Sequence, residues 1–314
     1  MSKTNFTSGG IQTKTFGERL CSPSLVVGLK QETLPFAAVN ILLAITAFVG
    51  NSLILVALHK ESSLHPPSKL LYRCLATTDL TSCLVTQLPH ATLWMYVDGE
   101  LWSLCLFAYD AGHITGYALC LVSLLTITAI SVDRLLALLL GLRYKQIVTL
   151  KRTYITVVTF WVVSVVAALC FILNYHITLW YGRIIIPSCL VISVASYSKI
   201  FHTLSQHQAK IHDPVQQHPR LPNALNMARY RKAVNGALWV QLAIVVCYLP
   251  YCLVEIVITH SKTYSSHLVV LWEIAIILIY FNSTLNPFLY CWKISEVRQA
   301  VKQTIRQELC CPWS

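Results

Sequence analysis

Long runs of apolar residues, separated by short polar segments, dominate the chain. Each run is at least as long as the roughly 20 apolar residues that a helix needs to cross the hydrocarbon core of a membrane. The pattern predicts seven membrane-spanning helices, at residues 35–59, 69–96, 103–138, 153–175, 178–204, 233–259 and 266–291. We therefore expect an all-α membrane protein, built as a bundle of seven helices.

Composition agrees with a chain that lies mostly in lipid. Of its 314 residues, 55% are hydrophobic and only 12% are charged. The spans divide the chain into an extracellular tail at 1–34, a membrane domain at 35–291 and a cytoplasmic segment at 292–314. They leave no room for a soluble enzyme domain, and the tail lacks the pattern of a cleaved signal peptide.

The basic residues are distributed unevenly between the two sides of the predicted bundle. The chain has 24 Lys and Arg against 13 Asp and Glu, a net charge of +11. Most of the basic residues lie on the side opposite the N-terminus, and cytoplasmic loops are the ones enriched in Lys and Arg. We predict a multi-pass plasma-membrane protein with its N-terminus outside and its C-terminus in the cytoplasm, and no nucleic-acid partner.

The segments outside the spans carry two candidate modification sites. Asn5-Phe6-Thr7 matches the acceptor pattern for N-glycosylation on the predicted outer side. Apolar residues recur at helical spacing through 293–308 beside basic ones, which predicts a helix lying on the inner lipid surface. Cys310 and Cys311 follow this helix and are candidates for palmitoylation, with free thiols as the alternative.

Several polar residues interrupt the apolar spans. Charged side chains at this depth are costly, so they usually face the protein interior and serve a function. Asp79 lies midway along the second span, and Asp133-Arg134 lies at the inner end of the third. Asn286-Pro287 lies in the last span, where proline removes a backbone hydrogen bond and kinks the helix. These residues predict a hinge beside a polar interior.

Taken in order, the motifs in the seven spans resemble those of the rhodopsin-like (class A) G-protein-coupled receptors. The matching residues are Gly50-Asn51, Leu75 to Asp79, Asp133-Arg134, Trp161, Tyr197, Cys247 to Pro250, and Asn286 to Tyr290. Within the family, the chain is loosely similar to the melanocortin, adenosine, cannabinoid and lysolipid branch. The resemblance implies a receptor, not an enzyme, that senses an extracellular ligand and activates a heterotrimeric G protein.

The resemblance also implies a switch at the cytoplasmic side. Arg134 would pair with Asp133 at rest and turn toward the G protein on activation, while Tyr197 and Tyr290 move inward. Many family members hold this arginine with an acid from the sixth span, but Tyr230 occupies the matching position here. We therefore predict raised basal signalling.

A sodium ion bound at Asp79 is the one cofactor that the resemblance implies. The polar residues of that site would be Asn51, Asp79, Ser123, Asn282, Ser283 and Asn286. Oxygen ligands of this kind suit a hard cation. A water-filled polar network without a specific ion is the alternative, and no other metal site is expected.

The external disulfide of the family has no counterpart in this chain. Tyr109 occupies the position of its first cysteine, and the second external loop, at about 174–180, contains no cysteine. Cys21 and Cys105 are the cysteines left on the outer side. They form either a substitute bridge or two free thiols.

The resemblance implies a ligand pocket that opens outward between the spans. Its candidate lining residues are Gln87, His90, Trp94, Asp110, His113, Gly116, Tyr117, Cys120, Tyr248, Tyr251, Glu255, Glu273 and Tyr280. Tyr280 replaces the lysine of opsins, and Gly116 replaces the aspartate of monoamine receptors. Asp110, Glu255 and Glu273 at the rim would favour a cationic ligand, unless they are solvated helix ends. Peptide, amine and lipid ligands stay open.

Two other functions compete with the receptor hypothesis. An ion channel or transporter would use Asp79, Asn282 and Asn286 as an ion path, but the chain lacks the internal repeat of many transporters. A receptor-like scaffold without signalling is the other alternative. The retained Arg134 and Tyr290 argue against it.

Overall fold

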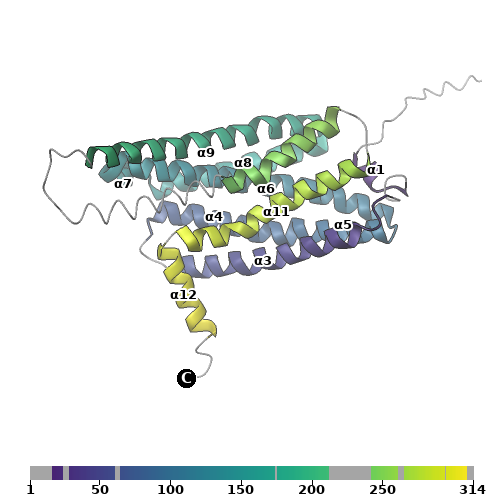
Figure 1. The fold of residues 1–314 in the computed structure, drawn as a ribbon, viewed down its shortest axis with the longest axis horizontal. Helices are drawn as coiled ribbons and strands as arrows, with labels where there is room; N and C mark the ends of the chain where they lie inside the picture. Colours follow the sequence, from purple (N-terminus) through teal and green to yellow (C-terminus); the bar gives the residue numbers. More distant parts are fainter. Residues whose placement is uncertain are drawn as a thin grey trace, which may run out of the picture.

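The computed structural model describes residues 16–23, 28–60, 64–173, 175–211, 242–260, 265–293 and 295–309. Within these residues the regular structure is entirely helical. Long helices run side by side along the long axis of the molecule, and one short helix turns away at the end that holds the C-terminus (Figure 1).

The long helices follow the predicted spans. They are α3 (Thr33–Lys60), α4 (Pro66–Ser82), α5 (Leu88–Asp98), α6 (Trp102–Leu140), α8 (Leu150–Leu173), α9 (Tyr175–Ile211), the helix Leu242–His260 and α11 (Ser266–Lys293). Six of the helices in the described residues are individually long and apolar enough to cross a membrane. The second predicted span is shared by α4 and α5, which together supply the seventh crossing.

A π turn at Cys83–Gln87 joins α4 to α5. The N–H of Leu88 donates to the carbonyl of Cys83, five residues back, instead of four. Pro89, which follows, has no N–H to give to the regular helical pattern, and such single turns accommodate the extra residue. The turn buries Thr86 against α6, where a Cβ added to Gly116 would lie 2.9 Å from the Thr86 Cγ2.

The first and last long helices approach each other closely. A Cβ added to Gly50 on α3 would lie 2.9 Å from the Pro287 Cγ on α11. The absence of a side chain at Gly50 therefore permits this contact. Pro287 lies inside α11, as the sequence predicted, so the crossing occurs where the backbone of α11 lacks one hydrogen bond.

α9 begins earlier than the sequence indicated. We expected a loop at about 174–180, but α8 ends at Leu173 and α9 begins at Tyr175. α9 takes up the residues that we had assigned to the loop, and it extends to Ile211.

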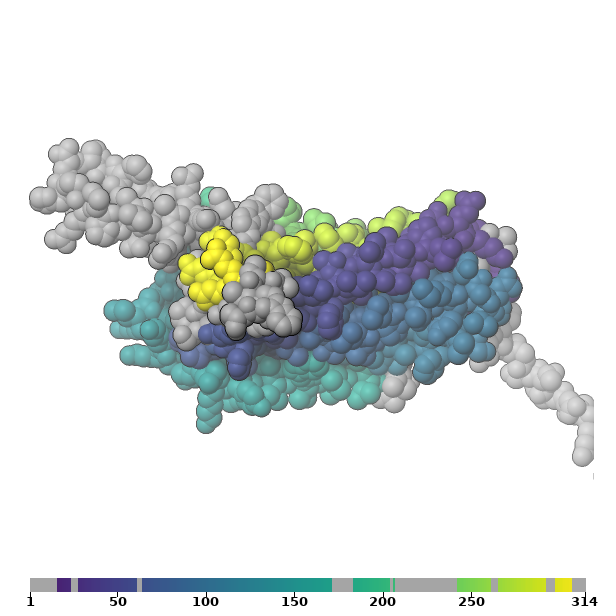
Figure 2. All heavy atoms as spheres, turned by 90° about the horizontal axis from the view of Figure 1, so that it is seen from below, coloured from purple at the N-terminus to yellow at the C-terminus, as the bar shows by residue number. Residues whose placement is uncertain are grey.

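The C-terminal helix α12 (Ser295–Leu309) is amphipathic, as its spacing predicted. Val297, Ala300 and Val301 are buried, whereas Lys302 and Arg306 are exposed. α12 packs against α3, and its yellow spheres lie near one end of the bundle in Figure 2.

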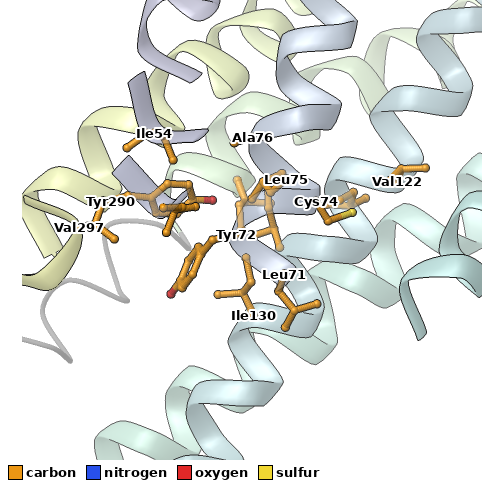
Figure 3. Close-up of a cluster of buried hydrophobic side chains, with 14 of the residues drawn as sticks. Ile54, Leu71, Tyr72, Cys74, Leu75, Ala76, Val122, Ile130, Tyr290 and Val297 are labelled. Carbon is orange, nitrogen blue, oxygen red and sulfur yellow. The ribbon is translucent and has the colours of Figure 1, made fainter. Parts of the chain in front are cut away.

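Two apolar clusters hold the bundle together. The larger one lies toward the α12 end and includes Ile54, Leu75, Val122 and Ile130, with the ring of Tyr72 beside that of Tyr290 (Figure 3). The second lies at the opposite end and includes Leu20, Cys105 and Val269. The polar residues that the sequence singled out lie between and around these clusters.

Candidate functional site

Asp79 is fully buried at the centre of a polar network. The Ser283 hydroxyl donates to its Oδ1 at 2.9 Å, and the Ser123 hydroxyl does so at 3.3 Å. The Asn286 amide donates to its Oδ2 at 2.7 Å. The network joins α4, α6 and α11, so a buried carboxylate that would be costly alone has donors on both oxygens.

The two other residues of the predicted set are placed differently. The Asn51 amide donates to the backbone carbonyl of Ser283 at 3.1 Å, which links α3 to the network without contact to the Asp79 carboxylate. Asn282 is buried, and no hydrogen bond joins its amide nitrogen to a partner within the described residues. The structure therefore brings together Asp79, Ser123, Ser283 and Asn286 directly.

Near the C-terminal end of α6, Asp133 has stronger partners than Arg134. The Tyr144 hydroxyl donates to its Oδ1 at 2.6 Å, and the Ser68 hydroxyl donates to its Oδ2 at 2.9 Å. The Arg134 Nη2 lies 3.8 Å from the same Oδ2, which makes an ion pair but not a hydrogen bond. The Arg134 guanidinium also lies over the Tyr72 ring, 5.5 Å from its centre.

Tyr72 connects this cluster to α11, and sequence reasoning missed it. Its ring packs edge-on against that of Tyr290, with 5.0 Å between the centres. Tyr72 precedes Asp79 by seven residues, two helical turns, so the two residues share a face of α4. That spacing was the available signal. Tyr197 is buried separately, against Leu135 and Leu138 of α6.

A cavity of about 960 Å³, part of it open space, lies between the helices on the other side of the Asp79 network. Eight of the thirteen predicted pocket residues line it: His90, His113, Gly116, Tyr117, Cys120, Tyr248, Tyr251 and Tyr280. Sequence reasoning missed Tyr109, Gly112, Ile186, Trp272, Ile276 and Ile279, which also line it. At its inner end the cavity reaches Asp79 and Ser283.

The three acids that we expected at the rim do not line the cavity. Glu273 is fully buried, with Asn40 donating to its Oε1 at 2.8 Å and the His90 Nε2 lying 2.8 Å from its Oε2. Its partners come from α3 and α5, which the local sequence around Glu273 could not reveal. Asp110 is exposed, and Glu255 is buried outside the lining.

The two remaining pocket predictions are also corrected. Gln87 and Trp94 are fully buried, and neither lines the cavity. The Trp94 ring packs against Phe36 of α3 at 5.0 Å between centres. Gln87 belongs to the π turn, which shifts the direction of the side chains that follow it by one residue.

The segment before α3 lies against the residues at the outer end of the cavity. It contains α1 (Phe16–Leu20), and a disulfide between Cys21 and Cys105 ties it to α6. The Phe16 ring lies 5.3 Å from that of Trp272 and 6.2 Å from that of Tyr109, and both of these line the cavity. The sequence offered the Cys21–Cys105 bridge as one alternative, but it gave no sign of the buried Phe16.

Comparison with known proteins places these features in a family. The model of the family "7 transmembrane receptor (rhodopsin family)" matches residues 50–179 and 173–290. The chain belongs to this family. Membership accounts for the helical bundle, since rhodopsin-family members are seven-helix membrane receptors that couple to G proteins in general and are not enzymes. The receptor's matched region contains the Asp79 network, the Arg134 cluster and the cavity.

Several predicted sites fall outside the described residues of the receptor. They are the glycosylation acceptor Asn5, the palmitoylation candidates Cys310 and Cys311, and Tyr230, on which the prediction of raised basal signalling depends. Within the described part, no group of three or more His, Cys, Asp or Glu side chains is arranged to hold a metal ion.

Proposed function

We propose that this receptor senses an extracellular ligand in the cavity and activates a heterotrimeric G protein through Arg134. The observation that supports this proposal is a continuous series of contacts from the cavity to Arg134. Asp79 lines the cavity and accepts a hydrogen bond from Asn286, and Tyr290, one turn further along α11, packs on Tyr72 beneath Arg134. A change at the cavity can therefore reach Arg134 through packed side chains and the backbone of α11.

The activating step would be a movement of α11. Pro287 leaves one carbonyl of that helix without its usual partner, so bending there costs less than elsewhere. Bending would move the Tyr290 ring away from Tyr72 and remove one side of the packing around Arg134. The Arg134–Asp133 pair, at 3.8 Å, and the contact with the Tyr72 ring would then remain as restraints on the guanidinium.

We also propose a sodium ion at Asp79. The residues present fit a hard cation, because a carboxylate and the hydroxyls of Ser123 and Ser283 meet at one point of the network. When bound, the ion would supply a positive charge that neutralises the carboxylate. Asp79, Ser123 and Ser283 would hold it, while Asn286 keeps its own hydrogen bond to the other carboxylate oxygen.

In the membrane, we place the N-terminus outside and α12 on the cytoplasmic surface. The exposed Lys302 and Arg306 of α12 support this orientation, because the inner leaflet carries the anionic lipids. A glycan at Asn5 and palmitate at Cys310 and Cys311 are consistent with it.

The experiment that tests the proposed function is a G-protein dissociation assay across the main Gα classes, without added ligand. Cells would express the receptor or its Arg134→Ala variant at matched surface levels. We expect a basal signal above that of mock-transfected cells, and its loss in the variant. A basal signal that survives the substitution would exclude the Arg134 switch, and a receptor at the surface with no basal signal would exclude the raised basal activity.

A further inference from the structure

The described wall of the cavity carries one acidic side chain and no Lys or Arg. The acid is Asp79, and both of its oxygens already accept hydrogen bonds from Ser123, Ser283 and Asn286. Glu273 is turned away and held by Asn40 and His90. In the part of the cavity away from Asp79, a charged ligand would lose its hydration without gaining a partner of opposite charge. This loss of hydration costs several kcal/mol.

One face of α6 gives the cavity its shape. Counted from Tyr109, the next four residues of this face lie three, four, seven and eight positions further along α6, which is helical spacing. They are Gly112, His113, Gly116 and Tyr117, and all five line the cavity. The Tyr109 ring is stacked on the His113 ring, with 5.4 Å between their centres and 27° between their planes. The rings of Tyr109 and Tyr117 thus lie before and after the two glycines, Gly112 and Gly116, on the cavity-lining face of α6.

The two glycines of this face differ in what surrounds them. A Cβ added at Gly116 would lie 2.9 Å from Thr86, so that glycine serves helix packing. A Cβ added at Gly112 would meet nothing within 4 Å, although Gly112 lines the cavity. The missing side chain at Gly112 therefore leaves open space beside the rings. This space belongs to the cavity and is not filled by a neighbouring helix.

We propose that the ligand is an uncharged, mostly apolar small molecule with a planar ring system, and that its ring occupies the space at Gly112. The inference rests on the proposed function and deepens it by naming the ligand class. Tyr109 and Trp272 contribute aromatic rings to the wall of the cavity, and Phe16 packs on both of them. Planar rings pack favourably against aromatic rings, edge to face as well as offset face to face.

The test uses matched compounds that differ only in charge, on the purified receptor in lipid nanodiscs without G protein. The probes are naphthyl ethanol, naphthyl ethylamine and naphthylacetic acid, with the same three head groups on indole and phenanthrene rings. The readout is the Tm of the receptor as a function of compound concentration. We expect a neutral member to raise the Tm, and its charged counterparts to bind roughly a hundredfold more weakly or worse.

Graded variants at Gly112 show where the ring binds. Gly112→Ala and Gly112→Val fill the space in two steps, and we expect successive losses of affinity, roughly tenfold or more for valine. Because an added Cβ meets no neighbour and alanine favours a helix over glycine, the ligand-free Tm of the alanine variant should be at least that of the wild type. This comparison also separates binding in the cavity from partition of the probe into lipid, which the substitutions leave unchanged.

Three results would overturn the inference: equal binding of the amines or acids, unchanged affinity in both Gly112 variants, or no binding by any neutral member. None of them bears on the Arg134 switch, because G-protein dissociation is measured separately and without ligand. Conversely, a receptor that binds the neutral compounds but gives no Arg134-dependent signal would refute the proposed signalling and leave the ligand class intact.

Discussion

At the scale of single residues, Asp133 decides how firmly Arg134 is held. Its carboxylate is buried and accepts hydrogen bonds from Tyr144 and Ser68, while Arg134 approaches no closer than 3.8 Å. Two neutral donors therefore compete with the arginine for the same two oxygens. The sequence predicted a pair between Asp133 and Arg134, but it did not reveal the competing donors, which come from α4 and from the segment after α6.

We predict that Tyr144→Phe lowers basal signalling. The substitution removes the hydroxyl that donates to Asp133 at 2.6 Å and leaves a buried carboxylate oxygen without that donor. The carboxylate should then attract the guanidinium of Arg134 more strongly, because an unpaired buried charge is costly. The G-protein dissociation assay without ligand measures the change, and Ser68→Ala should act in the same direction. Higher basal signalling in both variants would contradict the competition.

At the scale of helices, small residues such as Gly50 and Gly116 allow neighbouring helices to approach closely, and these contacts fix the arrangement of the bundle. The sequence predicted the spans well, because a long apolar run has one stable outcome in lipid. It did not predict the π turn, the early start of α9 at Tyr175, or the burial of Glu273. Each of these depends on a partner distant in sequence or on a local change of helical pattern. The burial of Glu273, for example, depends on Asn40 and His90, which belong to other helices.

We predict that Gly50→Ala destabilises the contact between α3 and α11. The new Cβ would lie 2.9 Å from the Pro287 Cγ, so one helix must shift. Overpacking of this kind costs about 1–3 kcal/mol, which should appear as a lower Tm. In a Pro287→Ala background the opposing Cγ is absent, and the same substitution should cost less. Equal losses in the two backgrounds would show that the two residues are not coupled.

At the scale of the whole molecule, the Asp79 network lies between the cavity and the Arg134 cluster and joins three helices. The sequence placed its members correctly in the chain, since Asp79, Ser123, Ser283 and Asn286 do meet. It could not separate them from Asn282, whose residue type fits equally well. The cavity was predicted in part. His113, Gly116 and Tyr117 of α6 do line it, whereas Asp110 of the same helix and the acids Glu255 and Glu273 do not.

We predict that sodium stabilises the receptor through this network. Raising NaCl at constant ionic strength, with choline chloride as the balancing salt, should raise the Tm because a ligand of the folded state stabilises it. Asp79→Asn removes the charge that attracts the cation, so its Tm should not respond. A response of the same size in the variant would place the sodium effect elsewhere.

The length of α9 has a mechanical consequence. With 37 residues, α9 is about 55 Å long at 1.5 Å per residue. Ile186 of α9 lines the cavity, and Tyr197 lies further along the same helix. A tilt of about 5° about the N-terminal end of α9 would displace its far end, beyond Tyr197, by about 5 Å. A small rearrangement around the cavity would in this way be enlarged on the side where Arg134 lies.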